Sequence, residues 1–198
     1  MKLLRSILLV SAILFMTGCA HSFVRPAPDA VKVGHSSRDE VLKLAGSPNF
    51  KNDNVKINGE TIQTVTYFHV EGAKFFGMIV PQRTLTYSFF NNMLIGDEYN
   101  SSFADESTNF QDDRFSEIVK GKSTRADVIA ILGKPAGVLL YPLIKNKDGK
   151  GIVYEYTVTR HAGIFSPTNR FLIIVGFDNN GVVEELSYKK NGEEQVKS

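Results

Sequence analysis

The residue with the most distinctive chemistry in this 198-residue chain is Cys19, its only cysteine. It ends the stretch MTGC and follows the apolar run ILLVSAILFM, which begins just after two cations, Lys2 and Arg5. Ten apolar residues are too few to span a bilayer as a helix, so residues 1–18 are predicted to be a signal peptide. A lone cysteine cannot form an intrachain disulfide, so the thiol is expected to be kept for a modification rather than for a redox role.

The other residues that could carry chemistry do not form a recognisable site. No metal-ligand spacing links the four histidines, which are His21, His35, His69 and His161. Glu184 and Glu185 are adjacent on an expected strand, so they point to opposite faces and cannot act as a pair. The stretch DNNG at 178–181 resembles the start of a calcium loop, but it lacks the later glutamate and is explained by a hairpin turn. The sequence therefore predicts a protein that is not an enzyme, with no catalytic residue, metal or cofactor.

The MTGC stretch resembles the lipobox of bacterial lipoproteins, with Met16 in the place where that pattern usually has Leu. The resemblance implies that Cys19 is the lipidation site and becomes the mature N-terminus. A plain secretory signal with a chance cysteine is the alternative. Ala20, rather than Asp, follows the cysteine, and by the same resemblance this favours the outer membrane. The expected localisation is therefore the outer membrane, lipid-anchored and facing the periplasm.

The charge balance gives no support for binding to nucleic acid. The chain has 23 Lys and Arg against 21 Asp and Glu, and the signal peptide contains two of the cations and no acid, so the mature chain is neutral. A neutral chain offers no strong basic surface for nucleic acid or anionic lipid. Membrane attachment is therefore expected to come from the N-terminal acyl chains.

Two stretches of the chain repeat each other at an offset of 87 residues. They are GHSSRDEVLKLAGSP at 34–48 and GKSTRADVIAILGKP at 121–135. In each, Ser or Thr can cap a helix of about three turns with one apolar face, which Gly-x-Pro ends. The cap in the first copy is either Ser36 or Ser37, the latter with Glu40 three residues later. The same offset pairs Tyr67 with Tyr154, so the chain is predicted to contain a tandem duplication.

Three strand-like runs follow each of these helices. They cover 64–70, 83–90 and 93–99 in the first copy, and 151–159, 170–177 and 182–189 in the second. A further short turn of helix is predicted before each main helix, in PDAVKV and FSEIVK. The expected fold class is therefore α+β, with two tandem repeats that are each a short helix pair followed by a three-stranded antiparallel sheet.

The predicted domain organisation follows from these elements and from the composition between them. It comprises a lipoprotein signal peptide (1–18), a tether with two prolines (19–30), a first repeat (31–99), an acid-rich connector (100–114), a second repeat (115–190) and a tail (191–198).

The second strands of the two copies differ in one face. In the first copy, polar residues alternate with apolar ones, as expected for a sheet with one face in water. At the offset of 87, the counterparts of these polar residues are Phe171, Ile173 and Val175. This face is therefore expected to be covered, either by the first repeat sharing its core or by another protein, or else to form the wall of a cleft for an apolar ligand.

Two loops between expected strands are apolar where a hairpin loop is usually polar. They contain GMIVP at 77–81 and GIFSP at 163–167. The residues proposed to bind a partner are Phe75, Phe76, Met78, Ile79, Ile164 and Phe165. They could instead complete the core beside a bulge or edge strand, or dip into lipid headgroups, although no cluster of Lys and Arg flanks them.

The repeat resembles the SmpA/OmlA (BamE-like) family of outer-membrane lipoproteins. The residues that carry the resemblance in the second copy are Gly121, Ser123, Val128, Leu132, Gly133, Pro135, Tyr154 and the stretch FDNNGVV. That family typically has one such unit, and a tandem of two resembles instead the β-lactamase-inhibitor-protein (BLIP-like) fold. The first resemblance implies a lipoprotein accessory to outer-membrane assembly, and the second implies sheets and hairpin loops presented to another protein.

The sequence as a whole predicts a lipid-anchored adaptor, facing the periplasm, that binds another envelope protein and serves outer-membrane assembly or integrity. A carrier of an apolar ligand and an inhibitor or chaperone of a periplasmic enzyme are the alternatives. The expected partners are an envelope protein and the membrane, without nucleic acid.

Overall fold

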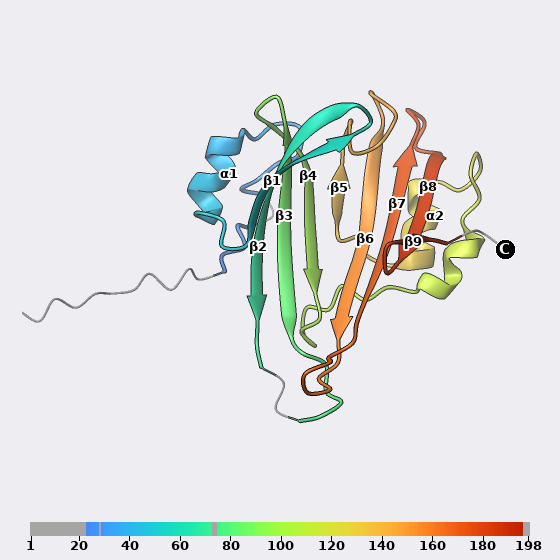
Figure 1. Ribbon diagram of the computed structural model, residues 1–198. Coiled ribbons are helices and arrows are strands. Elements are labelled where there is room, and N and C mark those ends of the chain that lie inside the picture. The colour runs from blue at the N-terminus through green and yellow to red at the C-terminus, as the bar shows by residue number, and fades with distance from the viewer. Residues whose placement is uncertain (1–22, 28, 73–74, 196–198) are drawn as a thin grey trace, which may run out of the picture.

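A computed structural model describes residues 23–27, 29–72 and 75–195 of the chain (Figure 1). The predicted signal peptide and Cys19 therefore lie outside the described residues. Among the residues that are described, no helix has the length and apolar character needed to cross a membrane.

One nine-stranded antiparallel sheet forms the body of the protein, and its strands follow the order of the chain (Figure 1). The strands are β1 (Lys51–Ile57), β2 (Glu60–Val70), β3 (Gln82–Phe90), β4 (Met93–Ser101), β5 (Gly137–Leu139), β6 (Lys150–Thr159), β7 (Thr168–Phe177), β8 (Val183–Lys190) and β9 (Glu193–Glu194). The short β5 pairs with β4 on one side and β6 on the other, so it joins the two halves. The predicted fold class, two α+β repeats with separate three-stranded sheets, is therefore wrong.

Three short helices contact one face of this sheet. They are α1 (Arg38–Ala45), the 3-10 helix η1 (Asp112–Glu117) and α2 (Arg125–Leu132). The predicted helix pairs are also wrong in the first half, because the described residues before α1 form turns and only α2 follows another helix. Residues 110–118, which include the end of the predicted connector, pack onto the second half of the sheet through Phe110, Phe115 and Ile118.

The two α-helices begin with the same local chemistry. Ser37 Oγ accepts a hydrogen bond from Glu40 N at 3.3 Å, and the Glu40 carboxylate accepts one from Ser37 N at 2.8 Å. Thr124 and Asp127 repeat this capping box in α2. Of the two caps that the sequence allows, Ser37 is therefore the correct one.

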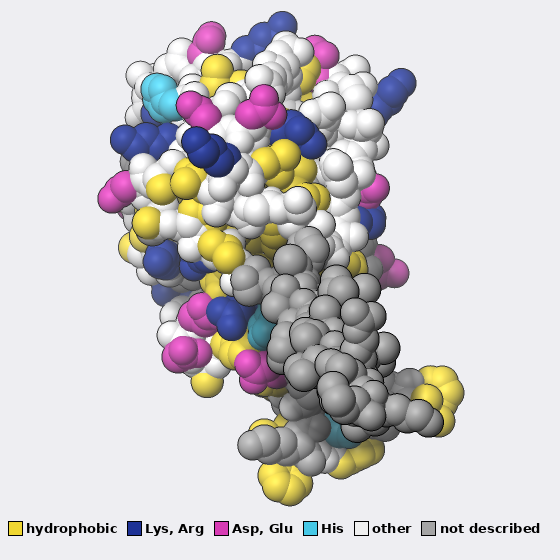
Figure 2. Space-filling model, turned by 90° about the vertical axis from the view of Figure 1, so that its left-hand side faces the viewer, with side chains coloured by type: hydrophobic (Ala, Val, Ile, Leu, Met, Phe, Trp, Pro, Cys, Tyr) yellow, Lys and Arg dark blue, Asp and Glu magenta, His cyan; other side chains and the backbone are white. Residues whose placement is uncertain are grey.

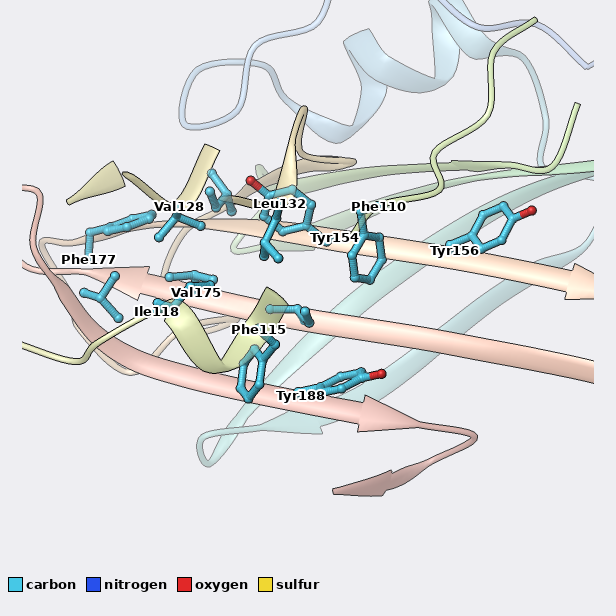
Figure 3. Packing of buried hydrophobic residues seen from close by; sticks show 13 residues of the cluster. Phe110, Phe115, Ile118, Val128, Leu132, Tyr154, Tyr156, Val175, Phe177 and Tyr188 are labelled. Carbon is cyan, nitrogen blue, oxygen red and sulfur yellow. The ribbon is translucent and has the colours of Figure 1, made fainter. Parts of the chain in front are cut away.

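The two α-helices are tied to the sheet by equivalent hydrogen bonds. The hydroxyl of Tyr67 donates to the carbonyl of Gly46 at 2.6 Å, and the hydroxyl of Tyr154 donates to the carbonyl of Gly133 at 2.9 Å. Each glycine ends its helix with a positive φ, which L side chains rarely adopt. Each half thus has its own core under its own helix, and the second core is shown in Figure 3.

The offset between the halves changes from 87 to 88 within the sheet. Tyr67 lies opposite Leu85, whereas Tyr154 lies opposite Ile173. The chain from the tyrosine to its partner on the next strand is therefore one residue longer in the second half, and a shift of one residue exchanges the two faces of a strand. Ile173 is thus the counterpart of the core residue Leu85, not of a polar residue.

This shift corrects the prediction made for Phe171, Ile173 and Val175. Ile173 and Val175 have no exposed surface, and they pack with α2 and η1 in the second core (Figure 3). Phe171 is half-buried against the same core. Their cover is the helical layer of their own half, so neither the first repeat nor a ligand covers them.

The opposite face of β7 is also apolar, and the chain itself covers it. Leu172 and Ile174 pack against Ile144, which belongs to residues 140–149, a segment that we name the strap. Glycines in the sheet make room for it, since a Cβ on Gly96 would lie 2.4 Å from Leu143 Cδ1 and a Cβ on Gly151 would lie 2.6 Å from Ile144 Cγ2. The strap therefore covers the part of this face that is distant from the two apolar loops.

Two edge strands, β1 and β9, were not predicted. Each is joined to its neighbour by an Asn-Gly pair, 58–59 before β2 and 191–192 before β9, in which both residues have positive φ. This dipeptide is the strongest short signal for a two-residue hairpin. The sequence therefore contained the signal for both strands.

Candidate functional site

The two apolar loops are brought together in space. Gly77 N donates to the His161 carbonyl at 2.6 Å, and His161 N donates to the Met78 carbonyl at 2.8 Å. Val80 N donates to the Thr159 carbonyl at 2.8 Å, which continues the pairing toward the sheet. The loops from the two halves therefore form one projection at one end of the sheet (Figure 1).

Most of the residues predicted to bind a partner are exposed on this projection. The exposed fractions are 69% for Phe75, 78% for Phe76, 46% for Met78, 94% for Ile164 and 86% for Phe165, and we name these five residues the apolar tip. The four highest values among the exposed large apolar residues of the described chain are all found here. Figure 2 shows apolar side chains gathered at this end of the molecule. These five side chains do not complete the core.

Ile79 differs from the other predicted contact residues. It is half-buried and forms a bridge with Arg160 of the second loop. The side chain of His161 also serves the loop structure, because its ring lies 6.3 Å from that of Phe76 in an edge-on arrangement. Both residues hold the two loops together, and the five residues of the apolar tip are exposed beside them.

A second surface lies on the sheet face opposite the helices. We name the region of this face between the strap and the apolar tip the open face; Asn100 is buried there, and its neighbours Thr84, Thr86 and Thr157 are half-buried. Its central side chains are Thr84, Thr86, Glu98, Asn100, Glu155 and Thr157. Asn100 Nδ2 donates to Thr157 Oγ1 at 3.0 Å, and Asn100 Oδ1 accepts from Thr157 N at 3.1 Å. These bonds join β4 to β6 where β5 has ended.

The open face contains a pair of carboxyl groups from the two halves. Glu98 on β4 and Glu155 on β6 lie on the same face of the sheet, close enough for each carboxyl group to affect the other. Burial, and then the charge of Glu155, raises the pKa of Glu98 to about 8. The Arg170 guanidinium, whose Nε donates to Glu155 Oε1 at 2.8 Å, partly offsets this effect. The single positive charge of Arg170 therefore does not offset the charges of two ionised carboxylates.

Sequence reasoning missed this pair for a clear reason. Glu98 and Glu155 are in different halves, and their strands are separated by the short β5. No spacing in the sequence indicates that they are close. Glu184 and Glu185, by contrast, are adjacent in the sequence but point to opposite faces and cannot pair. Among the described residues, no group of three or more His, Cys, Asp and Glu side chains could hold a metal ion.

Comparisons with known proteins include a weak structural likeness. No protein-family model and no curated protein matches the chain. The chain is similar to a crystal structure from Streptococcus mutans described as a "putative beta-lactamase inhibitor protein", with 14% identity over 80% of this chain and 84% of that chain. The TM-score is 0.38, which is too low to establish a common fold or function. The resemblance to the SmpA/OmlA family has no support among these comparisons.

Proposed function

We propose that the protein is a non-enzymatic lipoprotein adaptor, anchored in the outer membrane through Cys19, that binds another envelope protein through the open face. The observation that carries the proposal is that Glu98 and Glu155, from the two halves, lie close together on one face of the sheet among half-buried threonines. A rigid sheet presents these groups without further ordering, and such preorganisation lowers the cost of binding.

The chemistry of the pair indicates what kind of partner it favours. A lysine or arginine from another protein, placed between Glu98 and Glu155, would let both carboxyl groups ionise. The threonines around them are half-buried and offer hydroxyl groups for the rim of a contact. The proposed partner therefore presents a basic side chain at the centre of its binding surface.

The sequence also allowed the protein to be a carrier of an apolar ligand, with Phe171, Ile173 and Val175 as one wall of the binding cleft. The burial of these residues argues against such a cleft. Ile173 and Val175 have no exposed surface, so neither can line a cleft. A protein-binding role does not depend on that face, because the open face is formed by the other side of the sheet.

Photo-crosslinking in the native envelope tests the proposal. A photoreactive residue replaces Thr86 or Thr157 on the open face, and the exposed Lys122, in the turn before α2, serves as the control site. We expect a discrete protein adduct from the open-face sites and none from Lys122, and Glu155→Gln should weaken it. Equal labelling at all three sites, or no adduct in a protein that stays folded, would refute the proposal.

The lipid anchor requires a separate measurement. Mass spectrometry of the N-terminal peptide from membranes should show acyl chains on Cys19, and Cys19→Ser should release the protein from the membrane fraction. A mature N-terminus at another residue, with an unmodified cysteine, would contradict the anchor and leave the open face untouched.

A further inference from the structure

We propose that the apolar tip inserts into the surface of the lipid bilayer to which the chain is anchored. This inference rests on the proposed lipid anchor at Cys19. It gives the tip a different occupant from the protein partner that the sequence predicts, and it concerns a surface separate from the open face.

The first described residue, Phe23, lies at the end of the sheet that carries the tip. Its ring centroid is 6.4 Å from those of His69 and Tyr99, and the Arg83 guanidinium lies 5.2 Å from it. His69 and Arg83 face each other near the last rungs between β2 and β3, next to the loop that bears the tip. Arg25 then lies 3.6 Å over the Tyr99 ring. The predicted tether is therefore attached to the body from Phe23 onward.

This attachment leaves a short link to the membrane. Three residues lie between Cys19 and Phe23, so the Cα atoms of these two residues can be at most about 14 Å apart. An acylated Cys19 would therefore hold this end of the sheet, rather than the distant end, close to the lipid.

The tip projects far enough from this end to reach the same surface. Met78 is five residues from Arg83 along the chain, which corresponds to at most about 17 Å in an extended strand. The projection of the tip and the reach of the link are thus similar in length. When acylated Cys19 holds this end of the sheet at the membrane, the apolar tip therefore lies at the level of the lipid headgroups.

The chemistry of the tip suits lipid. Insertion removes exposed rings and aliphatic side chains from water, which stabilises the bound state in proportion to the apolar area. Among the described residues of the two loops, 71–72, 75–81 and 160–167, the only acid is Glu71, at the base of the projection. Few charges therefore need to be moved away from water when the tip inserts.

The backbone of the projection is also prepared for apolar surroundings. An unpaired peptide group is costly in lipid, so its hydrogen bonds must be made within the protein. The bonds between the two loops satisfy the amides of Gly77, Val80 and His161. Within the second loop, Arg160 N donates to the Pro167 carbonyl at 3.0 Å, and Ala162 N donates to Ser166 Oγ at 3.1 Å.

The test measures the surroundings of single positions in the full lipoprotein. Acylation blocks Cys19, so an environment-sensitive fluorophore can be attached to Ile164→Cys in the tip or to Asn180→Cys in the hairpin at the opposite end of the sheet. Each protein is bound to phosphatidylcholine vesicles that contain a quencher-labelled lipid. We expect a blue shift and quenching at position 164 and neither at position 180.

Failure of this inference can be separated from failure of the anchor. A vesicle-bound protein whose probe at 164 remains in water, or becomes shielded only by a protein in native envelopes, overturns lipid insertion while the anchor stands. An unmodified Cys19 in the mass spectrum overturns the anchor and, with it, the basis of the inference.

A second variant gives the magnitude. Phe76→Ser with Phe165→Ser removes two exposed rings, and we expect transfer of the lipoprotein between vesicles to become faster by roughly tenfold for each ring. Thermal unfolding should change little, because both side chains are exposed and the backbone bonds of Gly77 and His161 still join the two loops. An unchanged transfer rate would contradict insertion.

Discussion

The pair of Glu98 and Glu155 predicts an unusual dependence of stability on pH. Glu98 has a pKa of about 8 in the folded protein, against an ordinary value of 4.5. The folded state therefore holds a proton that the unfolded state has lost between these two values. Because the folded pKa is the higher one, the stabilising effect of that proton is complete below about pH 4.5 and is lost as the pH rises through 8.

Glu98→Gln isolates this effect, because the amide is neutral at every pH and can still donate to Glu155. Between pH 4.5 and 8, the free energy of unfolding of the natural protein should fall by up to about 1.4 kcal/mol per pH unit from this group. At pH 9 the variant should therefore be the more stable protein by up to about 5 kcal/mol, which is the pKa difference multiplied by this slope, whereas at pH 4 the two should be equal.

Urea denaturation measured from pH 4 to pH 9 checks this prediction. The control is Glu40→Gln, because the bonds from Ser37 lower the pKa of Glu40, which gives a contribution of opposite sign that is lost as the pH falls. Glu40→Gln should therefore keep the loss of stability at alkaline pH. If Glu98→Gln shows the same alkaline loss as the natural protein, the carboxyl pair does not hold a proton and the reasoning is refuted.

Three further substitutions, and one matched control, test the fold by urea denaturation at constant pH. Tyr154→Phe leaves the Gly133 carbonyl without its donor, so it should lower the free energy of unfolding by about 1 to 2 kcal/mol; no loss would mean that water replaces the hydroxyl. Gly137→Ala places a Cβ 1.6 Å from a backbone oxygen of β4, so it should cost at least about 3 kcal/mol, whereas Gly72→Ala, with open space around it, should cost almost nothing. Equal effects of these two would contradict the tight insertion of β5. Ser37→Ala removes one capping bond of α1 and should cost about 1 kcal/mol, and a neutral result would show that the cap is not needed.

The sequence allowed correct predictions for features of the fold that depend only on a few neighbouring residues. Ser37 and Glu40 are three residues apart, so the capping box of α1 could be identified as one of two possibilities. The Asn-Gly pairs at 58–59 and 191–192 carry equally local information, and their use would have revealed β1 and β9.

The errors arose where the outcome depends on distant parts of the chain. The extra residue that moves the offset from 87 to 88 lies between two strands, and nothing in the sequence shows that it changes the face of Ile173. The joining of both halves through β5 depends on Gly137, which admits the backbone of β4 at close range. Glu98 and Glu155 meet only because of that joining, so the carboxyl pair could not be predicted before the sheet was known.

The two edges of the sheet bear on whether neighbouring copies of this protein can associate. A bare strand edge is a template for a strand from another molecule, and charged or very short edge strands discourage this pairing. β1 carries Lys51, Asp53 and Lys56, and β9 consists only of Glu193 and Glu194. Edge-to-edge strand pairing between neighbouring copies is therefore disfavoured. The faces of each sheet stay accessible even when many copies are close together.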